Sequence, residues 1–187
     1  MNDLVHKYDS ALKQSCADFD FEAGYTLKNG DHVDSLELFN ILRTMMCEKR
    51  GVGLAAPQIG ILTRAFVIGN PSDPDAVIPI FNPRIVDATP EKEMYEEGCL
   101  SFPGLYLKIK RPVGIRVRYT NQHNVTDTMK FTGFTSRIFQ HEYDHLNGIL
   151  YTNRATPYHL ALAQKQLRSL DKLRKKNNKA KNQSYAT

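Results

Sequence analysis

The sequence predicts an α+β fold in which short strands gather around one central helix. Three observations lead to this fold class. Short runs rich in β-branched and aromatic residues lie between residues 64 and 131, and such runs are typical of strands. Residues 34–51 and 157–176 instead have apolar side chains at helical spacing. The chain has 187 residues, which is enough for one domain with its own core and too short to expect two.

The first helix is predicted to follow Asp34, because Asp34 and Glu37 together have the pattern of a capping box. Gly51 is expected to end this helix. The apolar positions between the two ends are Leu38, Ile41, Leu42 and Met45. The helical period therefore supports a helix that buries one face.

Four strands are expected after this helix, over residues 64–68, 77–81, 115–119 and 125–131. The last two are predicted to form a hairpin through residues 121–124. A second helix follows, with Thr135 or Ser136 as its N-cap, and Pro157 begins the last helix.

The second helix carries the most informative segment, Gln140-His141-Glu142-Tyr143-Asp144-His145. His141 and His145 are four residues apart, so both imidazoles lie on one face of a helix and can reach one divalent ion. The adjoining Glu142 can take a proton from a water bound to that ion and pass it to a leaving amine. We therefore predict a hydrolytic metal site with His141 and His145 as ligands and Glu142 as general acid and base.

A site of this type takes a third protein ligand and keeps one position open. The downstream pattern of the usual zinc peptidases is broken, because Tyr151 stands where their last histidine would be. No Glu follows Glu142; of the other downstream donors, Asp144 lies between the two histidines and Asp171 lies in a basic tail. The third ligand is therefore expected upstream, where Cys99 offers a thiolate that a metal ion would deprotonate.

Three segments, taken together, resemble the signature motifs of the peptide deformylase family in the same order and at plausible separations. They are Gly51-Val52-Gly53-Leu54-Ala55-Ala56-Pro57-Gln58, Glu97-Gly98-Cys99-Leu100-Ser101 and Gln140-His141-Glu142-Tyr143-Asp144-His145. The resemblance runs from about Ser35 to about Arg154. It implies antiparallel β-sheets packed around a central metal-binding HExxH helix, with a C-terminal helix. It also implies a hydrolase that removes the N-formyl group from the N-terminal methionine of newly made polypeptides and releases formate.

The resemblance adds residues around the metal. Gln58 and the backbone N–H of Leu100 would stabilise the oxyanion of the tetrahedral intermediate. Glu97 and Arg111 would pair behind the metal ligands, although Arg111 could equally be a solvated charge. Iron as Fe2+ is the metal that the resemblance favours, whereas a Cys-His-His site also suits Zn2+, and Ni2+ or Co2+ are further alternatives.

Substrate contacts are expected on both sides of the metal. The first motif is rich in small residues, so a peptide could add beside it as a strand and contact the backbone of Val52, Gly53 and Gly98; a packed core strand would show the same residues. The resemblance places the pocket for the methionine side chain at Tyr95, Phe134 and Ile138, although Ile138 is equally well explained as a core residue. Tyr106 stands where many family members have a basic residue near the bound peptide.

The charge of the chain is unevenly distributed. The whole chain carries +5, but residues 158–187 contain eight Lys or Arg and one Asp, a net +7, so residues 1–157 carry −2. We expect one catalytic domain over residues 1–157 and a basic C-terminal helix and tail over residues 158–187. The tail is interpreted either as a ribosome-binding segment or as a solvated helix docked on the body.

Two other functions are compatible with parts of the sequence. An HExxH metallopeptidase that cleaves peptide bonds would use the same metal helix, and a non-catalytic nucleic-acid-binding protein would explain only the tail. No signal segment and no apolar run near the ~20 residues of a membrane span are found in the sequence. We expect a monomeric protein without membrane contact, in the cytoplasm or in an organelle stroma, whose partners are formyl-methionyl nascent peptides.

Overall fold

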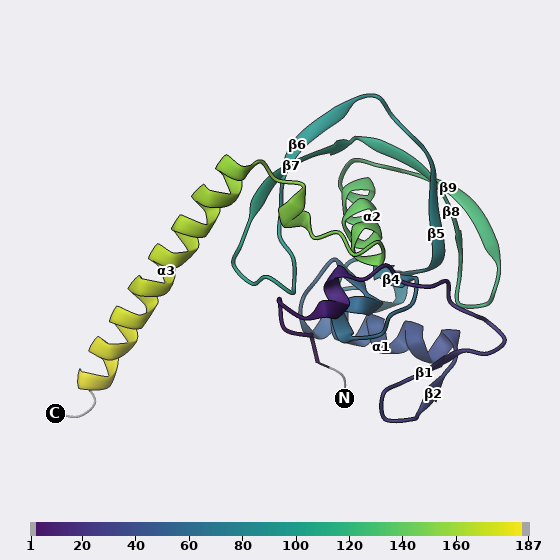
Figure 1. Cartoon of the computed structure of the whole chain (residues 1–187), viewed down its shortest axis with the longest axis horizontal. Helices are drawn as coiled ribbons and strands as arrows, with labels where there is room; N and C mark the ends of the chain where they lie inside the picture. The colour runs from purple at the N-terminus through teal and green to yellow at the C-terminus, as the bar shows by residue number, and fades with distance from the viewer. Residues whose placement is uncertain (1–2, 185–187) are drawn as a thin grey trace.

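The computed structural model describes the backbone of residues 3–184 and the side chains of residues 3–170 and 172. The chain has a mixed α/β fold with antiparallel sheets and three α-helices (Figure 1). This combination, with a helix at the C-terminal end, is the one that the sequence predicts.

The strands of the described residues form one large sheet and two small ones. The large sheet has the order β3-β4-β5-β8-β9, so β3 and β9 are its edges. Its strands are β3 (Gly53–Ala55), β4 (Ala65–Ile68), β5 (Ile78–Ala88), β8 (Gly114–Thr120) and β9 (Thr126–Thr132). The small sheets pair β1 (Tyr25–Thr26) with β2 (His32–Val33), and β6 (Lys92–Glu97) with β7 (Leu107–Pro112). All neighbouring strands are antiparallel.

The four predicted strands are confirmed as β4, β5, β8 and β9, and the last two form the predicted hairpin. Strand β5 continues to Ala88 because irregularities in its pairing with β8 let it bend without ending. The β6–β7 hairpin is not predicted. Strand β6 is exposed at five of its six positions and has four charged residues, so it lacks the apolar alternation by which a strand is found in a sequence.

Helix α1 (Ser35–Glu48) begins at the predicted capping box. Glu37 N–H donates to Asp34 Oδ1 at 2.8 Å, and Asp34 N–H donates to Glu37 Oε2 at 3.2 Å. The helix ends before Gly51, and Arg50 adopts a left-handed conformation with φ of 55°. The chain then enters the large sheet at β3.

Helix α2 (Gly133–Leu146) carries the HExxH segment. The predicted N-cap at Thr135 or Ser136 is wrong, because β9 passes directly into the helix and Thr132 occupies the cap position without a side-chain hydrogen bond. Gly133 permits this sharp entry with φ of 58°. Helix α2 contacts strands β3, β4, β7, β8 and β9 (Figure 1).

The last helix, α3 (Pro157–Ser184), begins at the predicted proline and extends away from the body in Figure 1. Its first turns pack on β7, where Leu160, Ala163 and Leu167 meet a small apolar core around Leu107 and Tyr151. Two larger cores lie between α1 and strands β3 and β4, and between α2 and the large sheet. The short 3-10 helices are η1 (Ser10–Lys13), η2 (Ala56–Ile59), η3 (Pro74–Ala76) and η4 (Tyr151–Asn153).

None of the helices in the described part of the chain is both long and apolar enough to cross a membrane.

Candidate active site

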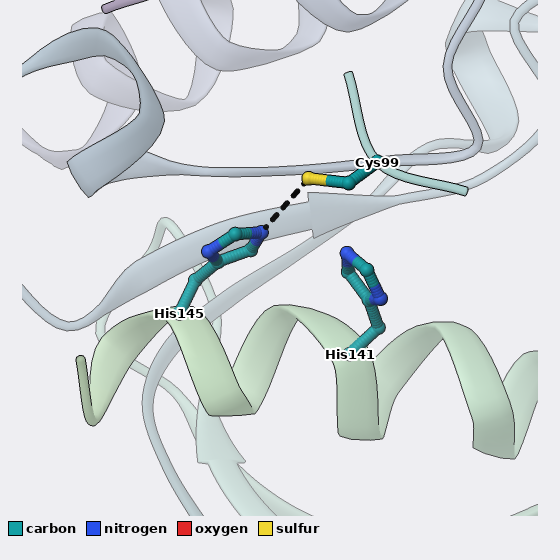
Figure 2. A group of neighbouring side chains, drawn as sticks. All are labelled: Cys99, His141 and His145. Carbon is teal, nitrogen blue, oxygen red and sulfur yellow. Dashed lines mark hydrogen bonds between the residues drawn. The ribbon is translucent and has the colours of Figure 1, made fainter. Parts of the chain in front are cut away.

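The structure brings the three predicted metal ligands together. His141 and His145 project from one face of α2, and Cys99 faces them from the loop between β6 and β7 (Figure 2). Their potential ligand atoms all lie within 4.8 Å of one another. Cys99 Sγ is 3.4 Å from His145 Nε2. A thiolate and two imidazoles suit a divalent transition metal, and three ligands leave one coordination position open.

Glu97, at the end of β6, contacts the ring of His141 and joins it to two arginines. Its Oε2 lies 3.1 Å from His141 Nδ1, which directs the other ring nitrogen of His141 away from Glu97. Arg111 donates to both oxygens of Glu97, at 2.6 Å from Nε and 3.0 Å from Nη2. Arg137 Nη1 donates to Glu97 Oε1 at 2.8 Å. All four side chains are buried, so this carboxylate is fully paired where water cannot compete.

Arg111 also joins Glu97 to a second buried carboxylate. Its Nη1 donates to Asp144 Oδ2 at 2.8 Å, and Arg154 donates to Asp144 Oδ1 at 2.6 Å. Asp144 lies on α2 between the two histidines, so the network ties the metal-binding helix to β7.

The charges of the site favour a bound cation. Burial alone would raise the pKa of Glu97, but hydrogen bonds from His141 and Arg111 outweigh it and lower that pKa to about 2. Burial alone would lower the pKa of His141, but its hydrogen bonds to Cys99 and Glu97 raise it to about 10. Burial lowers the pKa of His145. Positive charge is thus favoured at His141 by its contacts with Cys99 and Glu97, and disfavoured at His145 by burial.

Glu142 lies in the cleft in front of the ligands and is buried. Burial raises its pKa to about 7, while the charge of His141 opposes the rise. Among the described residues, no hydrogen-bond partner reaches Glu142 Oε2. A Cβ atom on Gly53 would lie 2.5 Å from Glu142 Oε1, so this carboxylate fits only because residue 53 lacks a side chain.

Gln58 is fixed beside Cys99 by three side-chain hydrogen bonds. The N–H of Ala55 donates to Gln58 Oε1 at 2.8 Å, which identifies that atom as the amide oxygen. Gln58 Nε2 therefore faces the metal ligands, 3.6 Å from Cys99 Sγ and 3.2 Å from Ser101 Oγ. The backbone N–H of Leu100 has no acceptor among the described residues. Gln58 Nε2 is thus a donor directed toward the ligands, and the Leu100 N–H follows Cys99 directly in the chain.

A cleft of about 710 Å³ opens in front of the metal ligands. Its lining contains the predicted residues Val52, Gly53, Gln58, Tyr95, Glu97, Gly98, Cys99, Leu100, Phe134, Ile138, His141 and Glu142. His145 and Arg111 do not line it, because both are buried behind it. On one side the rings of Tyr95 and Phe134 lie 6.3 Å apart, centroid to centroid, and both are about half exposed. This open apolar wall can accept a flexible side chain.

Strand β3 forms a free edge along the cleft. Val52 C=O accepts from Gly69 N–H at 2.9 Å, so the carbonyl of Val52 points toward β4. Because these groups alternate along a strand, those of Gly53 point to the open side. A Cβ atom on Gly98 would lie 2.8 Å from the ring of Tyr106, so the loop opposite the ligands also depends on a glycine.

Several lining residues were not expected from the sequence. Arg137 precedes His141 by four residues on α2, and this helical spacing was the only signal for it. Its guanidinium also lies 5.5 Å from the ring centre of Tyr95. Lys49 and Arg50 line the cleft where α1 ends. Phe102 and Leu105, in the loop that follows Cys99, also belong to the unexpected part of the lining.

Comparisons with known proteins agree with this geometry. A family model described as polypeptide deformylase matches residues 1–160. A peptide deformylase from Thermotoga neapolitana is 46% identical over 122 residues, which cover 65% of this chain and 73% of the relative. The crystal structure of a peptide deformylase from Thermotoga maritima matches with a TM-score of 0.72 and 33% identity, over 84% of this chain and 99% of that one. A class I type b peptide deformylase from Acinetobacter baumannii, crystallised with Met-Ala-Ser bound, has a TM-score of 0.71 and 30% identity, over 82% and 99%.

Proposed function

Because this chain belongs to the polypeptide deformylase family, and so is a metal-dependent hydrolase that removes the N-formyl group of formyl-methionyl peptides, we propose that the reaction takes place at Cys99, His141 and His145. The convergence of these three ligand atoms at one end of the cleft supports this assignment. The HExxH helix α2 would be the central element of the fold, since it contacts most strands of the large sheet and β7.

The ligand atoms would be Cys99 Sγ and one ring nitrogen from each histidine. His141 would bind through Nε2, because its Nδ1 faces Glu97. Fe2+ is the ion that we propose, with Zn2+, Ni2+ and Co2+ as the alternatives that the same donors accept. An ion bound there would supply a Lewis acid that activates water and polarises the formyl carbonyl.

Glu142 would move the protons of the reaction. Its carboxylate lines the cleft next to the ligands, and Gly53 leaves room for it. From this position Glu142 takes a proton from the water that attacks the formyl carbon and delivers it to the amine nitrogen of methionine. The formyl C–N bond breaks, and formate and a free amino group are the products.

Gln58 and Leu100 would stabilise the oxyanion that forms on the formyl group. Gln58 Nε2 is fixed toward the ligands by the bond that its Oε1 accepts from Ala55. The N–H of Leu100 follows Cys99 directly in the chain. Because these donors are in place before the reaction, they need little reorganisation as negative charge develops.

The peptide would bind along the edge of β3 as an added strand. Gly53 presents its backbone groups to the open side, and Val52 and Gly98 line the same cleft. The methionine side chain would enter the wall formed by Tyr95, Phe134 and Ile138. The Acinetobacter relative with bound Met-Ala-Ser supports a peptide that begins with methionine as the occupant of this cleft.

Formate release tests the proposed function most directly. Protein purified without oxygen should release formate from formyl-Met-Ala-Ser and should not act on acetyl-Met-Ala-Ser, which differs only at the acyl group. An intact formylated peptide with no formate would reject a deformylase, and cleavage between residues of the peptide would support the metallopeptidase alternative.

The basic helix α3 is proposed to guide the enzyme to ribosomal RNA near emerging chains. Lys165, Arg168 and Lys172 are exposed on it; the side chains of Arg174, Lys175 and Lys176 lie outside the described residues. Phosphate binding by such residues is driven by counterion release. We propose a cytoplasmic monomer in which residues 1–157 form the catalytic domain and α3 begins with turns docked on it.

A further inference from the structure

The charged residues that line the cleft are not evenly distributed. Lys49 and Arg50 line it beside the first motif, and Glu96 lines it on β6. Lys49 Nζ is 2.9 Å from Asp3, so that charge is largely compensated. Glu96 has Lys108 as its cross-strand neighbour. Arg50 is exposed, and its side chain makes no ion pair or hydrogen bond with any described residue.

The backbone of Arg50 is held in place. Arg50 N–H donates to Cys47 C=O at 3.0 Å, and Gly51 N–H donates to Met46 C=O at 2.9 Å, so the end of α1 is closed around it. Its φ of 55° lies in the left-handed region, where an arginine is less favourable than glycine or asparagine. The fold therefore fixes where the side chain of Arg50 begins.

The direction of a bound peptide follows from the proposed site. The formyl end must lie at the metal ligands, near Gly53 and Glu142. The cleft lining continues from Gly53 to Gly51 and Arg50. A peptide paired antiparallel with this segment therefore runs from the ligands toward Arg50.

The spacing of a strand then identifies the residue that meets Arg50. Successive residues of a strand advance by about 3.4 Å, and alternate side chains share one face. When the first residue of an extended peptide lies beside Gly53, the third lies about 7 Å further along, near the Arg50–Gly51 turn that precedes β3. Tyr106, which brings no charge of its own to the cleft, lines another part of it.

We propose that Arg50 is a specificity-determining residue that binds an acidic side chain at the third residue of the formylated peptide. This rests on the proposed function of the cleft. An arginine can donate two parallel hydrogen bonds to one carboxylate, and the guanidinium of Arg50 makes no such bonds with the described residues. The preference concerns binding, because residue three is remote from the scissile bond.

The experiment compares kcat/KM for three amidated peptides, formyl-Met-Ala-Asp-amide, formyl-Met-Ala-Asn-amide and formyl-Met-Asp-Ala-amide. Amidation removes the terminal carboxylate, which would otherwise compete for the same charge. Asp at position three should be favoured over Asn about three- to fivefold at low salt, mainly through KM, as expected for a partly solvated ion pair. The ratio should approach one in about 1 M salt, where the Debye length is about 3 Å.

Three variants separate the charge of Arg50 from other effects. Arg50→Asn removes the charge and suits the left-handed backbone, so it should bring the Asp-to-Asn ratio of kcat/KM to about one. Arg50→Lys keeps the charge and should retain part of the preference. Arg116→Gln removes an equivalent charge from an exposed position of β8, outside the cleft lining, and should retain all of the preference.

Two results would overturn the proposal. One is the lack of a charge effect: the Asp and Asn peptides have equal kcat/KM in the unaltered protein, or Arg50→Asn leaves the ratio of their kcat/KM values unchanged. The other is a preference only for Asp at position two, because that register excludes the contact argued above. Formate from the neutral peptide in these cases would leave the proposed function standing, whereas no formate from any peptide would reject the function itself.

Discussion

Arg137 donates to the same Glu97 carboxylate that contacts His141, and it does so from inside the helix that carries His141. The distance from Arg137 Nη1 to Glu97 Oε1 is 2.8 Å, and further bonds reach the carbonyl groups of Ile109 and Glu93. Arg137 therefore positions the support of one metal ligand and also contacts Tyr95 in the cleft wall.

Replacing Arg137 by Met should loosen His141. Loss of a partner behind a metal ligand commonly weakens metal binding by about 10- to 100-fold. Dissociation of Co2+ from the substituted protein, followed by its visible spectrum during transfer to a chelator, should be at least about tenfold faster. Arg154→Met is the matched control, because Arg154 pairs with Asp144 and is partly exposed. Equal dissociation rates for both variants would show that Arg137 has no positioning role.

Glu142→Gln should retain the metal and lose turnover. The amide cannot accept the proton, so kcat for formate release should fall by about 10²-fold or more. Metal content and kcat are measured on the same preparation. Glu96→Gln serves as control, since Glu96 is an exposed carboxylate of the same cleft. Near-normal turnover would remove Glu142 from the mechanism.

Metal content and activity of Cys99 variants should depend on how strongly the new side chain donates electrons to the metal. Cys99→Ala should lose bound metal and activity, whereas Cys99→Asp should keep an altered site, because a carboxylate coordinates but donates less charge. Metal analysis and formate assays compare both with Cys47→Ala, which changes a half-buried thiol on α1. Full activity of Cys99→Ala would contradict its assignment as a ligand.

The choice of iron can be tested by handling the protein in air. Protein purified without oxygen should contain Fe2+ and should lose activity on aerobic exposure, and Ni2+ or Co2+ should restore it. Metal content and formate release are followed together over time. Activity that survives prolonged aerobic handling with zinc as the only bound metal would contradict the iron proposal.

Removal of the outer part of α3 should separate ribosome binding from catalysis. Leu167 approaches the loop at Gly104, so the deletion should begin at Arg168 and leave the docked turns intact. Salt-sensitive cosedimentation with ribosomes should be lost, while hydrolysis of a formylated dipeptide changes by less than about twofold. Replacing Arg168 and Lys172 by Gln tests the same idea in the full-length chain. Unchanged binding of both variants at low salt would reject it.

The metal helix shows what local sequence predicts well. The period of a helix places His141 and His145 on one face whatever surrounds them, and the structure has them there. The capping box of α1 and the β8–β9 hairpin are likewise local, and both are confirmed. Cys99 could be predicted as the third ligand only because no suitable ligand lies downstream and because the sequence resembles the family.

Features that depend on distant segments could not be predicted in the same way. In the sequence, Arg137 is only one polar residue of α2. Its partners Glu97, Glu93 and Ile109 lie on β6 and β7, and only the folded chain brings them into contact with it. The need for glycine at position 53 appears only when Glu142 from α2 lies against it. Strand β6 gives no apolar signal, because most of its residues are charged and most are exposed. It forms a strand because it pairs with β7, which the sequence of β6 alone does not reveal.

If a peptide pairs with β3 as proposed, the hydrogen bond from Ala55 N–H to Gln58 Oε1 would limit which polypeptides can use the cleft. Beyond Gly53, the next outward-facing N–H of β3 is already occupied, so a pairing chain has no further backbone donor to bind. An internal segment of a protein must continue in both directions, and beside Ala55 it would find the backbone N–H already bonded to Gln58. A chain that starts with a single formylated residue needs only the open direction. In the proposed binding mode, one amide group would therefore distinguish the beginning of a polypeptide from its interior, before any side chain is recognised.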